Sequence, residues 1–593
     1  MTESSSTSSA SDTREKTPIA PRSTAVAMVG VSAIVLALAF YMGWGTPALP
    51  SNYYAVCSHH QAVYTVDATN SRVECLVIRD SYIVQTGSLA EIQTIPNVAI
   101  RFIPTDAIVV PGLSDSHGHL LEYGASKQLP LEGTNTVNDT VARVREYILS
   151  NPSILNNPEA FIRGGGWDHT SWPGEAWPTA ADLEADDIIR GRPVILQSKD
   201  CHAKWVSRRV LELSPPVEST TIDGGVVVMD EQMGVPSVFL DKAQDLLYEA
   251  PLTEAEQVSR FTRAVNDALA YGLTSVHDAG LDPESMEFFI RQAENGVDIP
   301  IRIYAMRAFN TTSSYWGNST RPFVGVANGR LTARSVKIFA DGALRTGGSA
   351  VIQLHEPYAD HPHTRGFMLL DPEVLFEFIP WFLRDGWQVN VHAIGDRANG
   401  IVLDAFEAAL EGVNVTALRP RLEHAQLMTR EDMERLGKLG VIASVQPTHA
   451  ISDMWYAEDR LGPERVKGLY AFRSLLSSGA KITLGSDFPV EDMNPLTGFY
   501  AAITRVSFDG NSPHGPDGWF PEERLTRIEA LRGMTIDPAY ASFTETQLGS
   551  LEVGKFADFV VLERDIMEIE ARDVLNTRVL ATVVDGRVVY GAL

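Results

Sequence analysis

Two histidines one residue apart, His117 and His119, follow a short apolar run, Ile108–Val110, that Pro111 and Gly112 interrupt. In an extended segment, residues i and i+2 point to the same face, so both imidazoles can reach one metal ion. Imidazole is a natural ligand for zinc or iron. Taken alone, a His-x-His pair is equally compatible with two surface histidines. The metal interpretation therefore depends on further ligands elsewhere in the chain.

Four later segments each end an apolar run with a residue that can bind a metal. They are residues 335–342 with Lys337, 388–393 with His392, 420–426 with His424 and 481–489 with Asp487. In a parallel barrel all strands end at one face, where the active site lies. The sequence therefore predicts that these four side chains converge with the two histidines. Any single histidine could instead be structural, but the placement of all of them at strand ends favours a site.

The elements between these residues alternate in type. Helical patterns at 254–271, 372–385 and 400–410 separate apolar strands, while short β segments occupy 62–66, 74–78, 82–86, 100–103, 557–562, 579–584 and 587–590. This order predicts an α/β fold with a parallel sheet. We expect a (β/α)8 TIM-type barrel at 111–544 and a small β-sandwich domain from both chain ends, 52–110 and 545–593. Residues from about 130 to 255 are too long for one connection and should form an insertion over the barrel mouth.

The first 44 residues differ in composition from the rest. Residues 1–24 are rich in Ser, Thr and Pro and are expected to be a disordered tail. Residues 25–44 carry no charge and match a hydrocarbon core of roughly 30 Å, which predicts a transmembrane anchor. A cleaved signal peptide is the alternative, although its apolar region is normally shorter, about 7–15 residues. Lys and Arg precede this span but none follows before Arg72, so we expect a single-pass membrane protein with a non-cytosolic catalytic domain.

Charge and cysteine content limit the other partners. The 75 Asp and Glu residues against 49 Lys and Arg give a formal net charge of −26. This balance disfavours nucleic acid, and no basic run argues otherwise. Cys57 and Cys75 flank an expected strand pair and could form a disulfide in an oxidising compartment, with two free buried thiols as the alternative. A homodimer is left open.

Seven motifs give the chain a resemblance to a known family. They are Val110–His119, Gly164–Asp168, Val336–Ala343, His392–Asp396, Leu422–Gln426, Gly485–Pro489 and Gly549–Asp558. On these motifs the chain resembles the amidohydrolase superfamily of metal-dependent hydrolases. It is most similar to the YtcJ-like (amidohydrolase 3) branch, which includes N-substituted formamide deformylases. The resemblance covers roughly residues 60 to 593 and is uninformative about the substrate.

The resemblance implies a role for each predicted ligand by its position. His117 and His119 would bind the more buried metal. His392 and His424 would bind a second metal. Asp487 would contact a metal and act as the general base. The resemblance therefore implies a divalent cofactor, expected to be zinc, with one or two ions per chain.

Lys337 decides the expected number of metal ions. It matches the family lysine that can be carboxylated. A protonated lysine beside a dication is repelled, whereas addition of carbon dioxide gives an anionic carbamate that can bridge two metals. The alternative is an ordinary strand lysine paired with a carboxylate such as Asp341. In that case one metal is expected.

Three residues are expected to face the substrate: Trp167, His202 and Arg345. His202 lies where the family has an Asp-Gly-His pattern, but Cys201 replaces the usual small residue and leaves the pocket shape open. Trp167, together with Trp172 and Trp205, could line an apolar pocket or equally form the core of the insertion. Arg345 follows an Asp-Gly pair at 341–342.

These features predict a metal-dependent hydrolase acting on a carbon–nitrogen bond of a non-peptide small-molecule amide. Metal-bound water would attack the carbonyl, and Asp487 would pass the water proton to the leaving nitrogen. One alternative is a deaminase of the same superfamily, which generally needs an added acid near the position of His392. No such acid is obvious in the Ala-Ile-Gly-Asp that follows His392. The other alternative, a noncatalytic binding protein on this fold, should have lost ligands, whereas all six candidates are present.

Overall fold

Short strands that are buried at every position build the central sheet. Gln388–Ala393 (β19), Ile442–Val445 (β21) and Ile482–Leu484 (β22) have no exposed residue. Complete burial is typical of parallel strands that are covered on both faces. The structure is a computed structural model and describes residues 53–593 except 175, 223, 232, 295–298, 310–314, 345–356, 361 and 363–364.

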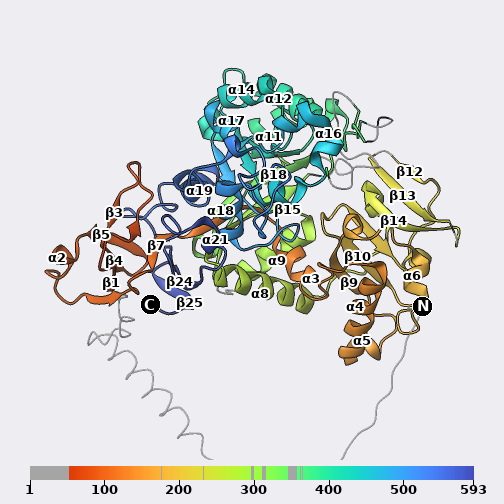
Figure 1. Ribbon diagram of the computed structural model, residues 1–593, viewed down its shortest axis with the longest axis horizontal. Helices are drawn as coiled ribbons and strands as arrows, with labels where there is room; N and C mark the ends of the chain where they lie inside the picture. The colour runs from red at the N-terminus through yellow and green to blue at the C-terminus, as the bar shows by residue number, and fades with distance from the viewer. Residues whose placement is uncertain are drawn as a thin grey trace, which may run out of the picture. The chain divides into compact units, whose positions relative to one another are not determined.

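Eight parallel strands form a nearly closed barrel in the order β8-β15-β16-β18-β19-β20-β21-β22. Figure 1 labels β15 and β18 of this barrel. The strands not yet given are Leu113–Gly118 (β8), Leu273–Leu281 (β15), Arg302–Ala308 (β16), Leu331–Phe339 (β18) and Arg421–His424 (β20). Just beyond the edge strands, Gly118 pairs with Phe488, and the Asp487 backbone N–H donates to the His117 carbonyl at 2.7 Å. The predicted parallel barrel is therefore present, and its closure lies beside the His-x-His pair.

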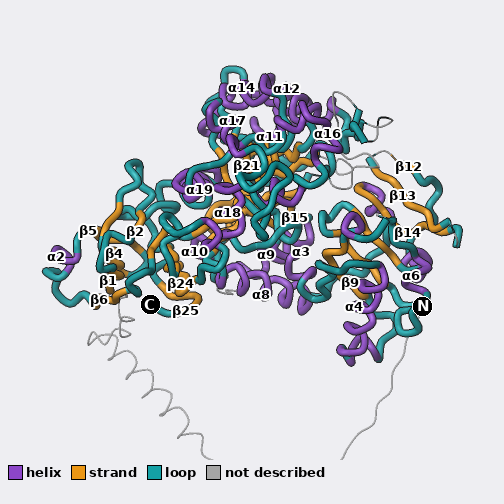
Figure 2. Tube along the Cα trace, in the orientation of Figure 1, coloured by secondary structure: helices purple, strands orange, loops and turns teal. Residues whose placement is uncertain are grey.

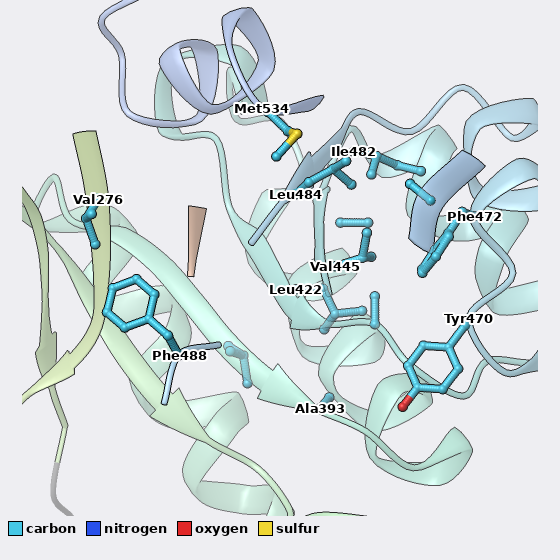
Figure 3. Packing of buried hydrophobic residues seen from close by; sticks show 14 of the residues in the cluster. Val276, Ala393, Leu422, Val445, Tyr470, Phe472, Ile482, Leu484, Phe488 and Met534 are labelled. Carbon is cyan, nitrogen blue, oxygen red and sulfur yellow. The ribbon is translucent and has the colours of Figure 1, made fainter. Parts of the chain in front are cut away.

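Helices pack around this sheet, as the alternation of purple and orange segments in Figure 2 shows. The main ones are Glu254–Ala270 (α8), Pro283–Glu294 (α9), Pro372–Arg384 (α11), Asp396–Leu410 (α12), Arg430–Leu439 (α14), Phe472–Ser477 (α17), Pro495–Thr504 (α18) and Arg527–Gly533 (α19). Leu422, Val445 and Leu484 come from three neighbouring strands and share one buried cluster with Phe472 of α17 (Figure 3). Burial of this apolar area is the main stabilising contribution to the barrel.

A second sheet is inserted between Leu120–Ser126 (α3) and α8. Its order is β12-β13-β14-β11-β10-β9, visible from orange to yellow in Figure 1. The strands are Ile162–Trp167 (β9), Val194–Ser198 (β10), Ala203–Val206 (β11), Thr221–Ile222 (β12), Gly225–Asp230 (β13) and Val235–Asp241 (β14). Together with Val137–Ser150 (α4) and Ala180–Glu184 (α6), this sheet buries an apolar cluster of its own.

Segments from both ends of the described chain meet in a third sheet, β25-β24-β23-β7-β2-β3. It contains Val63–Tyr64 (β2), Arg72–Val73 (β3), Ile108–Pro111 (β7), Phe559–Leu562 (β23), Val579–Val584 (β24) and Arg587–Gly591 (β25). A four-stranded sheet, β5-β4-β1-β6, joins Tyr53–Cys57 (β1), Cys75–Arg79 (β4), Tyr82–Gly87 (β5) and Ala99–Phe102 (β6). Leu76 of β4, Val109 of β7 and Phe559 of β23 share one core, so the two sheets pack together.

Two details of this region settle points that the sequence left open. Cys57 and Cys75 are joined by a disulfide between β1 and β4, so they are not free thiols. The apolar run 108–110 belongs to β7, which pairs with β23 in the end sheet, whereas the barrel strand β8 carries His117. Pro111 and Gly112 thus separate two strands of different sheets.

The predictions about a membrane require correction. The expected tail, 1–24, and the expected anchor, 25–44, lie outside the described residues. Within the described residues no helix is both long and apolar enough to cross a bilayer. The longest described helix, α8, has 17 residues and carries Glu, Arg and Asp, whereas a span needs about 20 predominantly apolar residues. The transmembrane helix, the membrane as a partner and the single-pass location with a non-cytosolic catalytic domain are therefore not upheld.

Candidate metal centre

The six predicted ligands lie together at the carboxyl ends of the barrel strands. His117 is in β8, Lys337 in β18, His392 in β19 and His424 at the end of β20, while His119 precedes α3 and Asp487 follows β22. All six line one cavity of about 510 Å³. Residues separated by up to 370 positions in the chain meet because parallel strands all end at the same face.

Asp487 and the His-x-His pair form the tightest group. Asp487 Oδ1 lies 3.1 Å from His119 Nε2 and 3.4 Å from His117 Nε2. His117 and then His119 hold the pKa of Asp487 well below its usual range, although burial alone would raise it. The carboxylate is therefore ionised and can either bind a cation or accept a proton.

The remaining predicted ligands surround the same space. The rings of His392 and His424 have centroids 4.4 Å apart, and Lys337 Nζ lies 3.3 Å from His117 Nε2. Burial, followed by the proximity of Lys337 or a neighbouring imidazole, lowers the pKa of these three histidines, to about 4 for His117. Metals bind the neutral form of imidazole, so this environment favours the ligand state.

His449 is a member of the site that the motifs did not reveal. It lies on Pro447–Asp453 (α15), just after β21, with its Nε2 3.7 Å from Asp487 Oδ2. The groups His117, His119, Asp487 and His424, His449, Asp487 each bring their ligand atoms within 4.8 Å of one another. The sequence signal for His449 was its position four residues beyond an apolar strand. It was missed because His449 lies on a helix rather than at the end of the strand.

Orphaned polar atoms show that a cation fits these residues. His424 Nδ1 and His449 Nε2 are buried and have no hydrogen-bond partner among the described residues. Buried polar atoms nearly always form hydrogen bonds, so two imidazole nitrogens that lack one and lie beside the Asp487 carboxylate fit the nitrogen and oxygen donors that a divalent ion prefers.

Lys337 does not make the structural ion pair that was its alternative. Asp341 instead accepts hydrogen bonds from the backbone N–H groups of Ile394 and Gly395, at 2.9 and 2.8 Å. Within the described residues Lys337 forms no ion pair, and burial lowers the pKa of its amine to about 8. The lowered pKa leaves more of the amine uncharged at neutral pH, and the uncharged amine is the form that reacts with carbon dioxide.

A buried carboxylate orients His117. Glu423 Oε2 lies 2.5 Å from His117 Nδ1, and Glu423 Oε1 lies 2.7 Å from Arg421 Nε. Burial alone would raise the pKa of Glu423, but Arg421 and then His117 hold it well below its usual range. The imidazole thus donates Nδ1–H to Glu423 and presents Nε2 to the cavity, as in a carboxylate–histidine–metal arrangement.

Of the three residues expected to face the substrate, only one is found in the wall of the cavity within the described part of the chain. His202 lines the cavity, and its Nδ1 contacts Asp241 Oδ1 at 2.6 Å. Although burial would lower it, the hydrogen bond to Asp241 raises the pKa of His202 to about 9. Trp167 is fully buried in the core of the inserted sheet, donates Nε1–H to the Leu196 carbonyl at 2.7 Å and does not line this cavity. Arg345 lies outside the described residues.

The nearly closed barrel and its cluster of buried imidazoles define a metal-dependent hydrolase. The chain belongs to the amidohydrolase family, whose model matches residues 105–590. This confirms the resemblance carried by the seven motifs, and it removes the noncatalytic binding protein from the alternatives.

Relatives span nearly the whole molecule. "Protein LONG AFTER FAR-RED 3" of Arabidopsis thaliana is 32% identical over 89% of this chain and 90% of its own length. "Putative amidohydrolase YtcJ" of Bacillus subtilis is 31% identical over 90% and 98%, and "N-substituted formamide deformylase" of Arthrobacter pascens is 27% identical over 89% and 97%. The crystal structure of an uncharacterised metal-dependent hydrolase from Pyrococcus horikoshii OT3 matches with a TM-score of 0.70 at 27% identity, covering 88% of this chain and 99% of that one.

The orphaned imidazole nitrogens lead to a prediction about metal binding. Purified protein should carry one or two equivalents of zinc or a similar ion, and chelation should lower its melting temperature because the ion stabilises the folded state. His424→Ala should reduce the stoichiometry or the affinity, measured by elemental analysis and calorimetry. His514→Ala removes a histidine paired with Glu458 outside the cavity and should bind metal normally. Equal metal binding by both variants would exclude His424 as a ligand.

Proposed function

We propose that this hydrolase cleaves the carbon–nitrogen bond of a small, non-peptide amide. The observation that carries the proposal is the convergence of four histidines, three of them buried, with Lys337 and Asp487 in one cavity at the carboxyl ends of the strands. The relative named N-substituted formamide deformylase supports a small N-substituted amide as the substrate class.

The ligand roles proposed from the sequence are retained, with one addition. His117, His119, His392, His424 and Asp487 would hold the divalent ion or ions, expected to be zinc, and His449 joins them as a further candidate. Such an ion lowers the pKa of a water molecule towards neutrality and polarises a carbonyl oxygen. The lowered pKa values of His117, His392 and His424 and the ionised state of Asp487 support this assignment.

The chain's own side chains would then handle the proton and the substrate. Asp487 accepts the proton of the attacking water and passes it to the leaving nitrogen, which departs as a neutral amine. His202, held by Asp241, is protonated at neutral pH because its pKa is raised to about 9. From the cavity wall it donates a hydrogen bond to the carbonyl oxygen as negative charge develops there.

The proton transfer gives the first test of the proposed reaction. Asp487→Asn should keep the fold but lose about 10²–10⁴-fold in turnover, because an amide cannot act as the base. A panel of N-formyl and N-acyl amines, with amine release as the readout, measures the loss. Asp509→Asn, at an exposed turn, is the matched control and should retain full turnover. A folded Asp487→Asn protein with unchanged turnover would remove Asp487 from the mechanism.

The raised pKa of His202 predicts how activity depends on pH. The protonated form is the active one, so kcat/KM should hold up to about pH 9 and fall above it as His202 loses its proton. His202→Gln should remove this alkaline limb and lower kcat/KM at neutral pH. His514→Gln should leave the profile unchanged. An alkaline limb that persists in His202→Gln would assign it to another group.

Lys337 is proposed to be carboxylated and to bridge two ions. Protein prepared with ¹³C-bicarbonate should then show a carbamate resonance that is absent from Lys337→Ala. That variant should lose one metal equivalent and recover part of its activity with added short carboxylates, which replace the missing anion. A plain lysine amine in fully metallated protein would contradict the carbamate.

A further inference from the structure

A second cavity, of about 490 Å³, lies between the inserted sheet and the helices α3 and α8. Its walls include Gly164–Gly166 of β9, Ile195 of β10 and Arg260 of α8. Four wall residues, Glu122, Cys201, Gln244 and Glu491, also line the metal-centre cavity. None of the proposed metal ligands lines this second cavity, so it is a neighbouring chamber with a shared wall.

Arg260 brings a largely buried guanidinium to this chamber. Glu122, Glu256 and Glu249 act on it from longer range and raise its pKa, but none of them forms an ion pair with it. The residue is only 8% exposed, and its Nε has no hydrogen-bond partner. Within the described part of the chain its guanidinium forms neither an ion pair nor a hydrogen bond. A buried charge without a partner is costly, and arginine is retained in such places where planar recognition of an anion is needed.

The backbone holds Arg260 in the cavity wall. A methyl group at Gly124 of α3 would lie 2.2 Å from the Arg260 carbonyl oxygen, so this glycine allows α3 and α8 to approach closely.

Burial, and then the nearby Arg163 guanidinium, lower the pKa of Arg260. An anion in the cavity would offset both the cost of burying the Arg260 charge and its repulsion from Arg163.

The other buried or half-buried cations of the wall already have partners. Arg163 Nε lies 3.6 Å from Glu249, which also pairs with Lys204. Lys199 Nζ lies 3.3 Å from Glu132 and 3.8 Å from Glu491. These cations thus have carboxylate partners. The guanidinium of Arg260 forms no ion pair among the described residues, so it remains available to a ligand.

We propose that this cavity binds a small organic carboxylate. Its two oxygens would pair with the guanidinium of Arg260, and its aliphatic or aromatic part would pack on Leu121, Ile195 and Leu252 of the same wall. The carboxylate belongs either to an arm of the substrate remote from the scissile bond or to a separate ligand. The assignment goes beyond the proposed reaction and does not rest on it.

Titration calorimetry on the metal-loaded protein tests this site. Benzoate and 3-phenylpropionate are the probes, and their neutral carboxamides are the controls. The carboxylates should bind more tightly than the carboxamides, and Arg260→Gln should weaken carboxylate binding by about tenfold to a hundredfold, the range for a charge-assisted pair. Arg263→Gln is the matched control, because Arg263 lies on the same helix but is exposed and paired with Asp267 at 2.7 Å; it should bind as the wild type does.

Thermal unfolding gives a second, independent readout. In anion-free buffer, Arg260→Gln should melt at the same or a higher temperature than the wild type, because an unpaired buried charge is removed. The carboxylates should raise the melting temperature of the wild type and not that of the variant. Affinity unchanged in Arg260→Gln would place the anion elsewhere, such as at the metal, and would overturn the proposal. A variant less stable without anion would overturn it as well.

Inhibition kinetics then separate the two sources of the carboxylate. Competitive inhibition that depends on Arg260 identifies an arm of the substrate, and noncompetitive inhibition that depends on Arg260 identifies a separate ligand. Both results support the anion site. Loss of turnover in Asp487→Asn with carboxylate binding intact would show that the reaction and the anion site are distinct properties.

Discussion

The ion pair between Glu423 and Arg421 is the interaction on which the site depends most. Both side chains are fully buried. Arg421 donates to the Ser116 carbonyl at 2.7 Å and to Ser444 Oγ at 2.9 Å, which ties β20 to β8 and β21. Glu423 in turn fixes the ring of His117. Such a pair is weak evidence for stability but strong evidence for orientation, because removing either partner leaves a buried charge.

Closure of the barrel supplies the second constraint. Asp115 of β8 accepts hydrogen bonds from the Ser486 backbone and hydroxyl, the latter at 2.6 Å. A side chain at Gly485 would lie 2.6 Å from the His117 backbone nitrogen, so only glycine permits this approach of β8 and β22. The same contact carries Asp487 to the His-x-His pair. The contacts that close the fold thus also bring the Asp487 carboxylate to the other proposed metal ligands.

Features that depend on strand topology could be predicted from the sequence, whereas features that depend on side-chain packing could not. His392, His424 and Asp487 could be placed together because parallel strands end at one face. His449 was not predicted because it lies on a helix after its strand. Trp167 was ambiguous because a tryptophan in an insertion can line a pocket or fill a core. Glu423 stood within a quoted motif, but its role as a partner of His117 required the pairing of distant strands. The run 25–44 satisfied length and hydropathy alone, which do not by themselves establish a membrane span.

Binding of a divalent ion by His117, His119 and Asp487 at the closure of the barrel is the central claim. Anomalous X-ray diffraction across the zinc edge, on crystals of zinc-loaded protein, tests it most directly. We expect an anomalous peak in the cavity, in contact with these three side chains and reaching His392 or His424 if a second ion is present. A cavity without a peak at full zinc loading, or zinc bound only at exposed histidines such as His514, would contradict it.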